Sequence, residues 1–322
     1  MQNVLITGAA GFIGSQLATK LLNSTLYRVI LADNVSPTIP ASYGPDKGLC
    51  LTADLCDPEQ VSSMISASKP LKAVFLFHGI MSSGSEADPD LSRRVNLDAT
   101  ALVLSMLAKE CPGVRVIYAS SVAIYGTPLP KVVTDATTPT PLGTYGTHKF
   151  MTELLINEMN RRGQIDAFSL RFPTISVRPG KPTQAASSFF SGMIREPMNG
   201  LECVVPLVDR DFTTSLCGPR TLVENLVKMM EMPGDVLPSH IRFLNMPGIP
   251  VTVQDMMDAL AEVGGRDKLE LLREEEDPSC AALLRSWPGK FDYSTALGLG
   301  LEVDGSFVEV VREYVATLDT KS

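Results

Sequence analysis

The stretch GAAGFIGSQL, residues 8–17, places three glycines between an apolar run and an apolar helix pattern. The run VLIT before it, residues 4–7, is apolar enough to be a buried strand. After it, Ile13, Leu17 and Leu21 recur at helical spacing. Glycine is costly at a helix start unless its missing side chain is needed. The stretch therefore predicts a strand, a tight turn and a helix whose N-terminus must stay accessible.

The three glycines are typical of a turn that binds a dinucleotide. Gly8 allows the tight turn after the strand, Gly11 lets a phosphate approach the backbone, and Gly14 lets the helix pack closely on the sheet. The first helical turn, with Phe12 and Ile13, then presents free N–H groups to a pyrophosphate. A glycine-rich turn without any ligand is the alternative interpretation.

An acidic residue ends the next predicted strand, YRVILAD at residues 27–33. Asp33, with Asn34 beside it, is placed to accept hydrogen bonds from both adenosine ribose hydroxyls. No Arg or Lys follows in DNVSPTIP, so a 2′-phosphate would meet an uncompensated carboxylate. We therefore expect NAD rather than NADP as the cofactor. A turn formed by Asp33 and Asn34 is the alternative.

A second acidic residue, Asp54, follows the third predicted strand in TADLCD. Its carboxylate is expected to accept a hydrogen bond from the adenine amino group, while Leu55 packs on the adenine ring. An Asx turn, or a cap for the helix that begins near Pro58, would explain the same carboxylate without a ligand.

Strands and helices alternate along the first half of the chain, which predicts an α/β fold with a doubly wound parallel sheet of the Rossmann type. We assign residues 1–176 to this NAD-binding lobe. The alternation then stops, so residues 177–322 are expected to form a smaller mixed C-terminal lobe that binds the substrate, with some exchange of chain between the lobes. The expected strands are 4–7, 27–33, 49–55, 72–79, 114–121 and 166–176, and the expected helices include 12–23, 61–68 and 145–163.

The segment YGTHK sets Tyr145 and Lys149 four residues apart, so on a helix their side chains share a face. A nearby ammonium group stabilises a phenolate and lowers the tyrosine pKa toward working pH. Ser121, at the end of a predicted strand, is placed to hydrogen-bond the substrate oxygen that Tyr145 serves. Its neighbour Ser120 is expected to make a structural contact. A solvated Tyr–Lys pair and a strand-capping Ser121 are the alternatives.

Taken together, these motifs resemble the extended short-chain dehydrogenase/reductase family, also called the NAD-dependent epimerase/dehydratase family. The resemblance covers nearly the whole chain, including DYSTALGLGLEVDGSFVEVVREYV at residues 292–315. It implies that Tyr145 is the acid/base, that Lys149 lowers its pKa and binds the nicotinamide ribose, and that Ser121 positions the reacting oxygen. It also implies that Pro173 and the neighbouring backbone in RFPTIS hold the nicotinamide amide.

Three longer stretches resemble the D-erythronate dehydrogenase group and related sugar-acid dehydrogenases within this family. They are SGSEADPDLSRRVNLDAT, LPKVVTDATTPTPLGTYGTHK and PTISVRPGKPTQAASSFFSGMIREPMNG. The resemblance implies hydride transfer between NAD and a secondary alcohol or ketone of a small polyol or sugar acid. There are departures: HGIM at 78–81 replaces an HLAA-like run, and Thr213 and Ser215 stand where a basic residue and a tryptophan are expected.

Two other functions stay open. A sugar-nucleotide epimerase or dehydratase would oxidise its substrate transiently and retain its NAD. A dehydratase would need an acid/base pair of carboxylates beside Ser121, and the segment SSVAIYG contains no carboxylate. The second is a non-catalytic NAD-sensing protein. An intact set of Ser121, Tyr145 and Lys149 argues against it, because a sensor has no use for a tuned phenol.

Candidate substrate contacts are less specific. Arg178 and Lys181 in SVRPGKP are placed to hold an anionic substrate, although surface cations on a Pro/Gly-rich loop explain them equally well. Among the histidines, we expect His78 to be a sheet-end residue near the cofactor. We expect His148 to be exposed, because it points about 100° away from Lys149 around the helix. The weaker substrate candidates are Ser121, Thr174, Ser187, Ser188 and Arg220.

The composition of the 322 residues limits the partners and the compartment. A net charge of −8 argues against a nucleic-acid or anionic-membrane surface. The six cysteines form no CxxC pair and there are only three histidines, so we expect no metal site. No leader pattern and no apolar run of about 18 residues is visible. We expect a cytoplasmic enzyme whose partner is a small-molecule substrate, with a homodimer left open.

Overall fold

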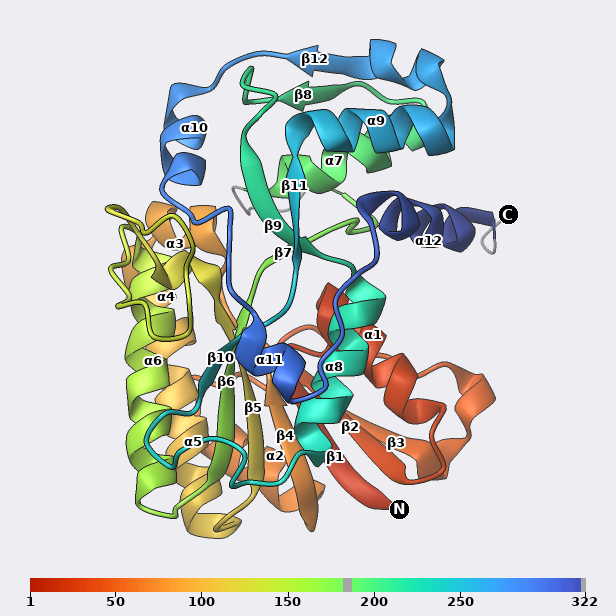
Figure 1. The fold of residues 1–322 in the computed structure, drawn as a ribbon. Coiled ribbons are helices and arrows are strands. Elements are labelled where there is room, and N and C mark those ends of the chain that lie inside the picture. The colour runs from red at the N-terminus through yellow and green to blue at the C-terminus, as the bar shows by residue number, and fades with distance from the viewer. Residues whose placement is uncertain (182–186, 320–322) are drawn as a thin grey trace. The chain divides into compact units, whose positions relative to one another are not determined.

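The computed structural model describes residues 1–181 and 187–319, and its chain divides into two compact units (Figure 1). Unit 1 consists of Met1–Ile124, Gly143–Arg171 and Val223–Leu244. Unit 2 consists of Tyr125–Leu142, Phe172–Leu222 and Asn245–Ser322. The chain therefore passes between the units more than once. The boundary after residue 176 remains a prediction about which part of the chain binds the substrate.

A seven-stranded sheet in the order β10-β6-β5-β4-β1-β2-β3 forms the centre of unit 1. β1 pairs in parallel with β2 and β4, β2 with β3, and β4 with β5. The order reverses direction at β1, as in doubly wound dinucleotide-binding folds, and confirms the predicted fold class. The strands are β1 (Gln2–Thr7), β2 (Tyr27–Asp33), β3 (Gly48–Thr52), β4 (Leu71–Leu76), β5 (Arg115–Ser121), β6 (Asp166–Phe172) and β10 (Phe243–Asn245).

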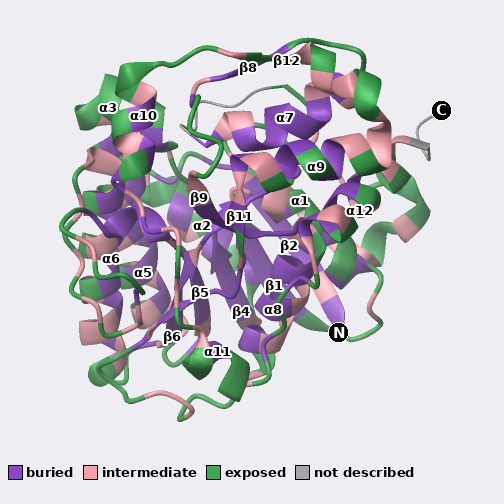
Figure 2. Ribbon diagram, turned by 45° about the horizontal axis from the view of Figure 1, so that its top comes forward, coloured by how far each residue is buried: buried purple, intermediate pink, exposed green. Residues whose placement is uncertain are grey.

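Helices bury the apolar side chains of this sheet, and most of its strand residues are buried (Figure 2). On one face, Val61, Leu104 and Ile156 from three helices pack against Leu5 and Val116 of the strands. Burial of this kind is the main favourable contribution to folding. The helices are α1 (Phe12–Leu22), α2 (Pro58–Ser68), α3 (Ser82–Ala87), α4 (Pro89–Ser92), α5 (Ala99–Glu110), α6 (Thr144–Arg161) and α8 (Pro219–Glu231), whose last nine residues belong to unit 1.

The sheets of unit 2 have fewer strands than the sheet of unit 1, and their strand pairs include both parallel and antiparallel ones. β9 pairs in parallel with β7 and antiparallel with β11, and β8 pairs in parallel with β12. Its core gathers Phe190, Leu216, Met256 and Val311 from different elements. The strands are β7 (Thr174–Ile175), β8 (Cys203–Val205), β9 (Thr213–Cys217), β11 (Ile249–Thr252) and β12 (Leu272–Glu274), and the helices are α7 (Ser188–Met198), α9 (Val253–Gly264), α10 (Pro278–Arg285), α11 (Ser294–Gly298) and α12 (Phe307–Asp319).

Candidate active site

The glycine turn between β1 and α1 has the geometry that its sequence predicts. Gly8 has φ +68°, and a Cβ built on it would lie 2.6 Å from the backbone nitrogen of His78. A Cβ on Gly14 would lie 2.5 Å from the carbonyl oxygen of Gly8. Both glycines are therefore required by the backbone itself, Gly8 for the turn and Gly14 for the close packing. These two predicted structural roles are confirmed.

Gly11 is the N-cap residue of α1, and no side chain of the described residues caps this end of the helix. The first turn also contains no acidic residue. Backbone N–H groups at an uncapped helix start need an acceptor, and the helix dipole favours an anionic one. The N-terminal turn with Phe12 and Ile13 therefore fits the pyrophosphate of a dinucleotide, as predicted, and that binding role stays a prediction for these residues.

Asp33 is hydrogen-bonded to the glycine turn itself. Its Oδ2 accepts from the backbone N–H of Ala10 at 2.9 Å, and its Oδ1 accepts from that of Val35 at 3.3 Å. The second bond forms the turn given above as the alternative role of Asp33, and the carboxylate remains at the end of β2. Asn34, next to it, is exposed. The carboxylate thus stands beside the turn where an adenosine ribose is expected, and that contact remains a prediction.

Asp54 forms the Asx turn considered as its alternative role, because its Oδ1 accepts from the N–H of Cys56 at 2.9 Å. It does not cap the next helix. Asp57 caps α2, with Oδ1 accepting from the N–H groups of Glu59 and Gln60. Leu55 is buried. The predicted contacts of Asp54 and Leu55 with adenine remain predictions.

Tyr145 and Lys149 share a face of α6, as their spacing predicts. The Lys149 Nζ lies 5.4 Å from the centroid of the Tyr145 ring and donates to the carbonyl oxygen of Ala119 at 2.6 Å. Lys149 is only 4% exposed. Burial lowers the pKa of Lys149 to about 7, against the opposing attraction of the Glu153 carboxylate. An ammonium group that can lose its proton near neutral pH beside a phenol is suited to acid/base chemistry.

The two serines at the end of β5 have different surroundings. Ser121 is half-buried, and its Oγ accepts from the backbone N–H of Ala123 at 3.1 Å. This is the capping contact considered as its alternative. The hydroxyl proton of Ser121 is not used in that bond, so it remains a donor for a substrate oxygen. Ser120 is buried and donates to Glu153 Oε1 at 2.5 Å, which is the structural contact predicted for it.

Sequence reasoning missed the ion pair that holds this corner of unit 1. Arg171 Nη2 lies 2.7 Å from Glu153 Oε2, and both side chains are fully buried. The guanidinium of Arg171 also stacks 4.0 Å from the ring centroid of Phe243. Through Glu153 the pair links β6, α6 and the Ser120 hydroxyl. Two signals were available: a Glu four residues after Lys149, and an Arg within the otherwise apolar strand DAFSLRF.

His78 and His148 differ in how well their surroundings were predicted. His78 follows β4, with Nδ1 2.8 Å from Thr7 Oγ1 and Nε2 3.0 Å from Thr100 Oγ1. Burial, then the nearby Lys149 charge, lowers the pKa of His78 to about 3, so it stays neutral at working pH. His148 was expected to be exposed, and that prediction is wrong. It is 8% exposed, because α3, α4 and a π-helical turn (Arg93–Asp98) cover that side of α6.

The predicted contacts after β6 lie in unit 2. Pro173 is buried, and Thr174 Oγ1 lies 3.3 Å from Thr214 Oγ1. Arg178 Nε donates to the carbonyl oxygen of Ile175 at 2.9 Å, which bends the side chain back toward its own backbone. Ser215, where a tryptophan was expected, lies 2.6 Å from the Tyr293 hydroxyl.

The weaker substrate candidates of unit 2 come from different segments of the chain. Ser187 is buried at the start of α7, and Ser188 is half-buried beside it. Lys181 is exposed and borders the residues 182–186, which lie outside the described part of the chain. Arg220 is 67% exposed and pairs with Glu313 at 2.5 Å. Substrate binding by these residues remains a prediction, and for Arg220 the existing ion pair already neutralises the guanidinium.

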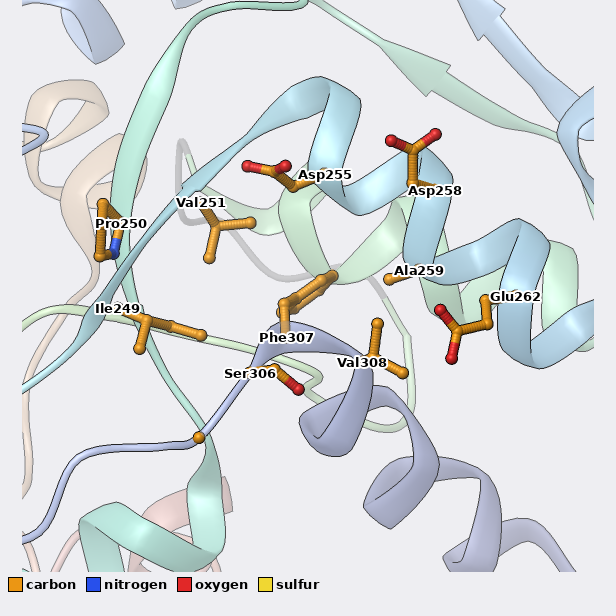
Figure 3. Close-up of a pocket in the computed structure, with 11 residues that line it drawn as sticks. Ile249, Pro250, Val251, Asp255, Asp258, Ala259, Glu262, Ser306, Phe307 and Val308 are labelled. Atoms are coloured by element: carbon orange, nitrogen blue, oxygen red, sulfur yellow. The ribbon is translucent and has the colours of Figure 1, made fainter.

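A groove of about 440 Å³ lies in unit 2 between β11, α9 and the start of α12, and none of the predicted site residues lines it (Figure 3). Its carboxylates already have partners. Asp255 completes a capping box with Thr252, and Glu262 accepts from Arg312 at 2.7 Å. Asp258 accepts from the amide of Gln254 at 2.9 Å. The groove therefore offers surface ion pairs and helix caps rather than a reactive centre.

The described residues offer neither a metal site nor a membrane-spanning helix. Within 1–181 and 187–319, no group of three or more His, Cys, Asp or Glu side chains is arranged to hold a metal ion. Across the same residues, no helix has both the length and the apolarity needed to cross a membrane.

Comparison with known proteins places the chain in a family. Residues 4–235 match the NAD dependent epimerase/dehydratase family. D-erythronate dehydrogenases from Haemophilus influenzae and Cupriavidus necator are each 39% identical, and each alignment covers 97% of this chain and 98% of the relative. The crystal structure of a nucleoside-diphosphate-sugar epimerase from Agrobacterium tumefaciens superposes with a TM-score of 0.90 at 31% identity, covering 98% of this chain and 94% of that one.

The fold and the Tyr145–Lys149 site thus define a dinucleotide-dependent oxidoreductase of the short-chain dehydrogenase/reductase class. The chain belongs to the NAD dependent epimerase/dehydratase family, and its cofactor is NAD. The glycine turn and the Asp33 carboxylate fit that cofactor. The family, the enzyme class and the cofactor predicted from sequence are confirmed.

Proposed function

We propose that this protein is a dehydrogenase of small sugar acids, and that D-erythronate or a close relative is its substrate. The observation that carries the catalytic part is the buried Lys149 ammonium beside the Tyr145 ring, with the Ser121 hydroxyl at the end of β5. Support for the substrate class comes from the two D-erythronate dehydrogenases that match nearly the full chain.

In the proposed oxidation, Ser121 donates a hydrogen bond to the substrate hydroxyl and orients it toward Tyr145. The Tyr145 phenolate takes the hydroxyl proton as the C–O bond becomes a carbonyl, and the Lys149 ammonium stabilises the phenolate beforehand. Burial lowers the pKa of Lys149 to about 7, so the ammonium beside Tyr145 can also give up its proton near neutral pH. When bound, NAD accepts the hydride that leaves the substrate carbon.

Roles for the remaining predicted residues follow from their places. Gly11, Phe12 and Ile13 are proposed to hold the pyrophosphate, and Asp33 with Asn34 the adenosine ribose. We assign the adenine to Asp54 and Leu55, and the nicotinamide amide to the backbone around Pro173. Substrate contacts are proposed for Thr174, Arg178, Ser187 and Ser188.

The test is a screen of purified protein with NAD against sugar acids and, separately, against nucleotide sugars. We expect the absorbance of reduced nicotinamide to rise with D-erythronate or another small sugar acid, and the Tyr145→Phe variant to abolish the rise. Absence of reduced cofactor with every sugar acid tested would contradict the proposal.

An epimerase that retains NAD is the second candidate, favoured by the structural similarity to the Agrobacterium nucleoside-diphosphate-sugar epimerase. The same preparation separates the two. A dehydrogenase must exchange its cofactor at every turnover, so NAD should be removed by gel filtration. Protein that keeps stoichiometric NAD through gel filtration and interconverts a nucleotide sugar would favour the epimerase. NAD binding with neither activity would favour a sensor.

We also propose a homodimer located in the cytoplasm. Support for self-association comes from α6, where Met151 and Leu154 are 46% and 53% exposed three residues apart. Support for a reducing compartment comes from the cysteines, all six of which are free thiols. Light scattering tests the first point: the natural chain should have twice the monomer mass, and Leu154→Glu should shift it toward the monomer. A monomer in the natural chain would contradict it.

A further inference from the structure

A chain of buried polar side chains lies beside the Tyr145–Lys149 pair within unit 1. His148, between the two on α6, places Nδ1 3.0 Å from the Ser92 Oγ. Ser92 Oγ donates to Ser85 Oγ at 2.9 Å, and Ser85 Oγ donates to the carbonyl oxygen of Ile80 at 3.2 Å. Ser85 and Ser92 are both fully buried. A satisfied buried network of this kind specifies one arrangement of the groups it joins.

The direction of the chain follows from its protons. Each hydroxyl has one proton to donate. Ser85 gives its proton to Ile80 and Ser92 gives its proton to Ser85, so Ser92 can only accept from His148. The imidazole therefore carries its proton on Nδ1. The network runs from the imidazole to the backbone of Ile80 without a break.

The far end of the network is clamped next to Lys149. The Asn96 amide binds both sides of Ile80: Oδ1 accepts from its N–H at 2.6 Å, and Nδ2 donates to its carbonyl oxygen at 3.0 Å. The same Nδ2 contacts Ser92 at 3.2 Å. Gly79 precedes Ile80, and a Cβ built on it would lie 4.0 Å from the Lys149 Nζ. The backbone that the network fixes is thus the backbone beside the Lys149 ammonium.

We propose that His148 is a positioning residue whose Nδ1–H, acting through Ser92 and Ser85, holds the Gly79–Ile80 backbone against Lys149 and keeps water from its ammonium group. The role rests on the proposed function, because Lys149 is the group that tunes Tyr145. It also accounts for the buried position of His148, which its sequence pattern does not predict.

The charges around His148 are compatible with this neutral role. The acidic groups that face it are Glu86 and Asp98, and Arg93 opposes them. Burial lowers the pKa of His148 and outweighs these partly balanced charges. Below that pKa the ring would gain a second proton on Nε2 and bring a positive charge into the buried network, which would destabilise it. The positioning role therefore belongs to the neutral form.

The experiment measures the pKa of Lys149 directly by NMR of side-chain-labelled lysine, in the NAD-free chain and without substrate. In the natural chain it should lie near 7. Ser92→Ala breaks the network and should raise it by roughly one unit or more, because water then reaches the ammonium. His148→Leu should do the same. His148→Asn keeps a donor near the Nδ1 position and should restore a value close to that of the natural chain.

Ser68→Ala is the matched control, since Ser68 is another fully buried helix serine, bonded to the Met64 carbonyl at 2.6 Å and absent from the network. It should lower stability without moving the Lys149 pKa. An unchanged pKa in folded Ser92→Ala would overturn the proposal, even if stability falls. Should His148→Leu not fold, Ser92→Ala alone decides, because it removes a single oxygen. The readout needs no substrate, so a failed substrate screen leaves this result interpretable.

Discussion

The Tyr145–Lys149 site of unit 1 buries its ionisable side chain, whereas the groove between α9 and α12 in unit 2 leaves its ionisable side chains exposed. The first buries an ammonium group against aromatic rings, with Lys149 only 4% exposed. The second has a volume of about 440 Å³, yet its carboxylates are exposed and occupied by helix caps and ion pairs. The difference teaches that the candidate site is marked by a desolvated charge rather than by the open groove. Each prediction below tests one side of this comparison.

Tyr145→Phe should have one of the two largest effects on turnover. The change removes the proposed acid/base and leaves the ring, so kcat should fall by roughly a hundredfold or more while NAD affinity stays within about twofold. The matched control is Tyr43→Phe, which removes a hydroxyl bonded to Asn23 elsewhere in unit 1. Steady-state kinetics and NAD titration check both variants. Near-normal turnover in Tyr145→Phe would place the chemistry elsewhere.

Lys149→Met should lower turnover at least as much, and it should also change how stability depends on pH. Because the pKa of Lys149 falls from 10.5 in the unfolded chain to about 7 in the folded one, the unfolded state binds more protons between these values. The burial cost is complete below pH 7 and fades as pH rises toward 10.5. The variant should therefore be more stable than the natural chain by roughly a few kcal/mol at pH 6 and equal to it near pH 10.5.

Denaturant unfolding of both chains across that range measures the difference. A stability gap that does not shrink as the pH rises would show that Lys149 is not desolvated in solution. The corresponding groove variant, Glu262→Gln, should show no comparable pH dependence, because the Arg312–Glu262 pair is exposed on both sides.

Asp33→Ser should narrow the preference for NAD over NADP by roughly tenfold or more. The reason is electrostatic: the carboxylate that would repel a 2′-phosphate is gone. Titration with the two cofactors measures the ratio of the dissociation constants before and after the change. Equal affinities in the natural chain would contradict the assignment of Asp33.

Ser121→Ala should lower kcat/KM less than Tyr145→Phe or Lys149→Met does. It removes one hydrogen bond to the substrate, so the loss of kcat/KM should correspond to about 1–3 kcal/mol of transition-state stabilisation. Ser120→Ala is the neighbouring control. It leaves the buried Glu153 short of one donor, so it should reduce the free energy of unfolding while kcat changes little. If Ser120→Ala lowers kcat more than Ser121→Ala does, the roles of the two serines are reversed.

Asp258→Asn in the groove should have the smallest effect, with kcat and NAD affinity within about twofold of the natural chain. Its carboxylate is exposed and bonded only to Gln254 among the described contacts. A loss of activity comparable to that of Ser121→Ala would show that the groove belongs to the functional site.

Local rules were enough to predict the first half of the molecule. The glycine turn, the Asp33 position and the shared face of Tyr145 and Lys149 all follow from spacing within one or two elements, and their geometry is as expected. The family resemblance added the roles that spacing alone leaves open.

What sequence reasoning missed depends on contacts between distant elements. His148 was expected in solvent because helical geometry gives its angle around α6 but not what covers that side of the helix. Its cover comes from α3, α4 and the π-helical turn, including Ser92, which lies 56 residues earlier. The Glu153–Arg171 ion pair likewise joins a helix to a strand. Arg220 pairs with Glu313, which lies 93 residues later in the sequence.

The hydrogen bond from the Ala10 backbone N–H to the Asp33 carboxylate affects the free energy of cofactor binding. A flexible loop must lose conformational entropy when it closes on a ligand, which weakens affinity. Here Asp33 fixes the loop backbone from the neighbouring strand during folding. The loop is thus preorganised, and the cofactor meets a surface whose order is already established. One carboxylate therefore sets both the preference for NAD over NADP and the order of the glycine loop. A substitution of Asp33 that narrows the cofactor preference should also loosen the loop, and so weaken the binding of both NAD and NADP.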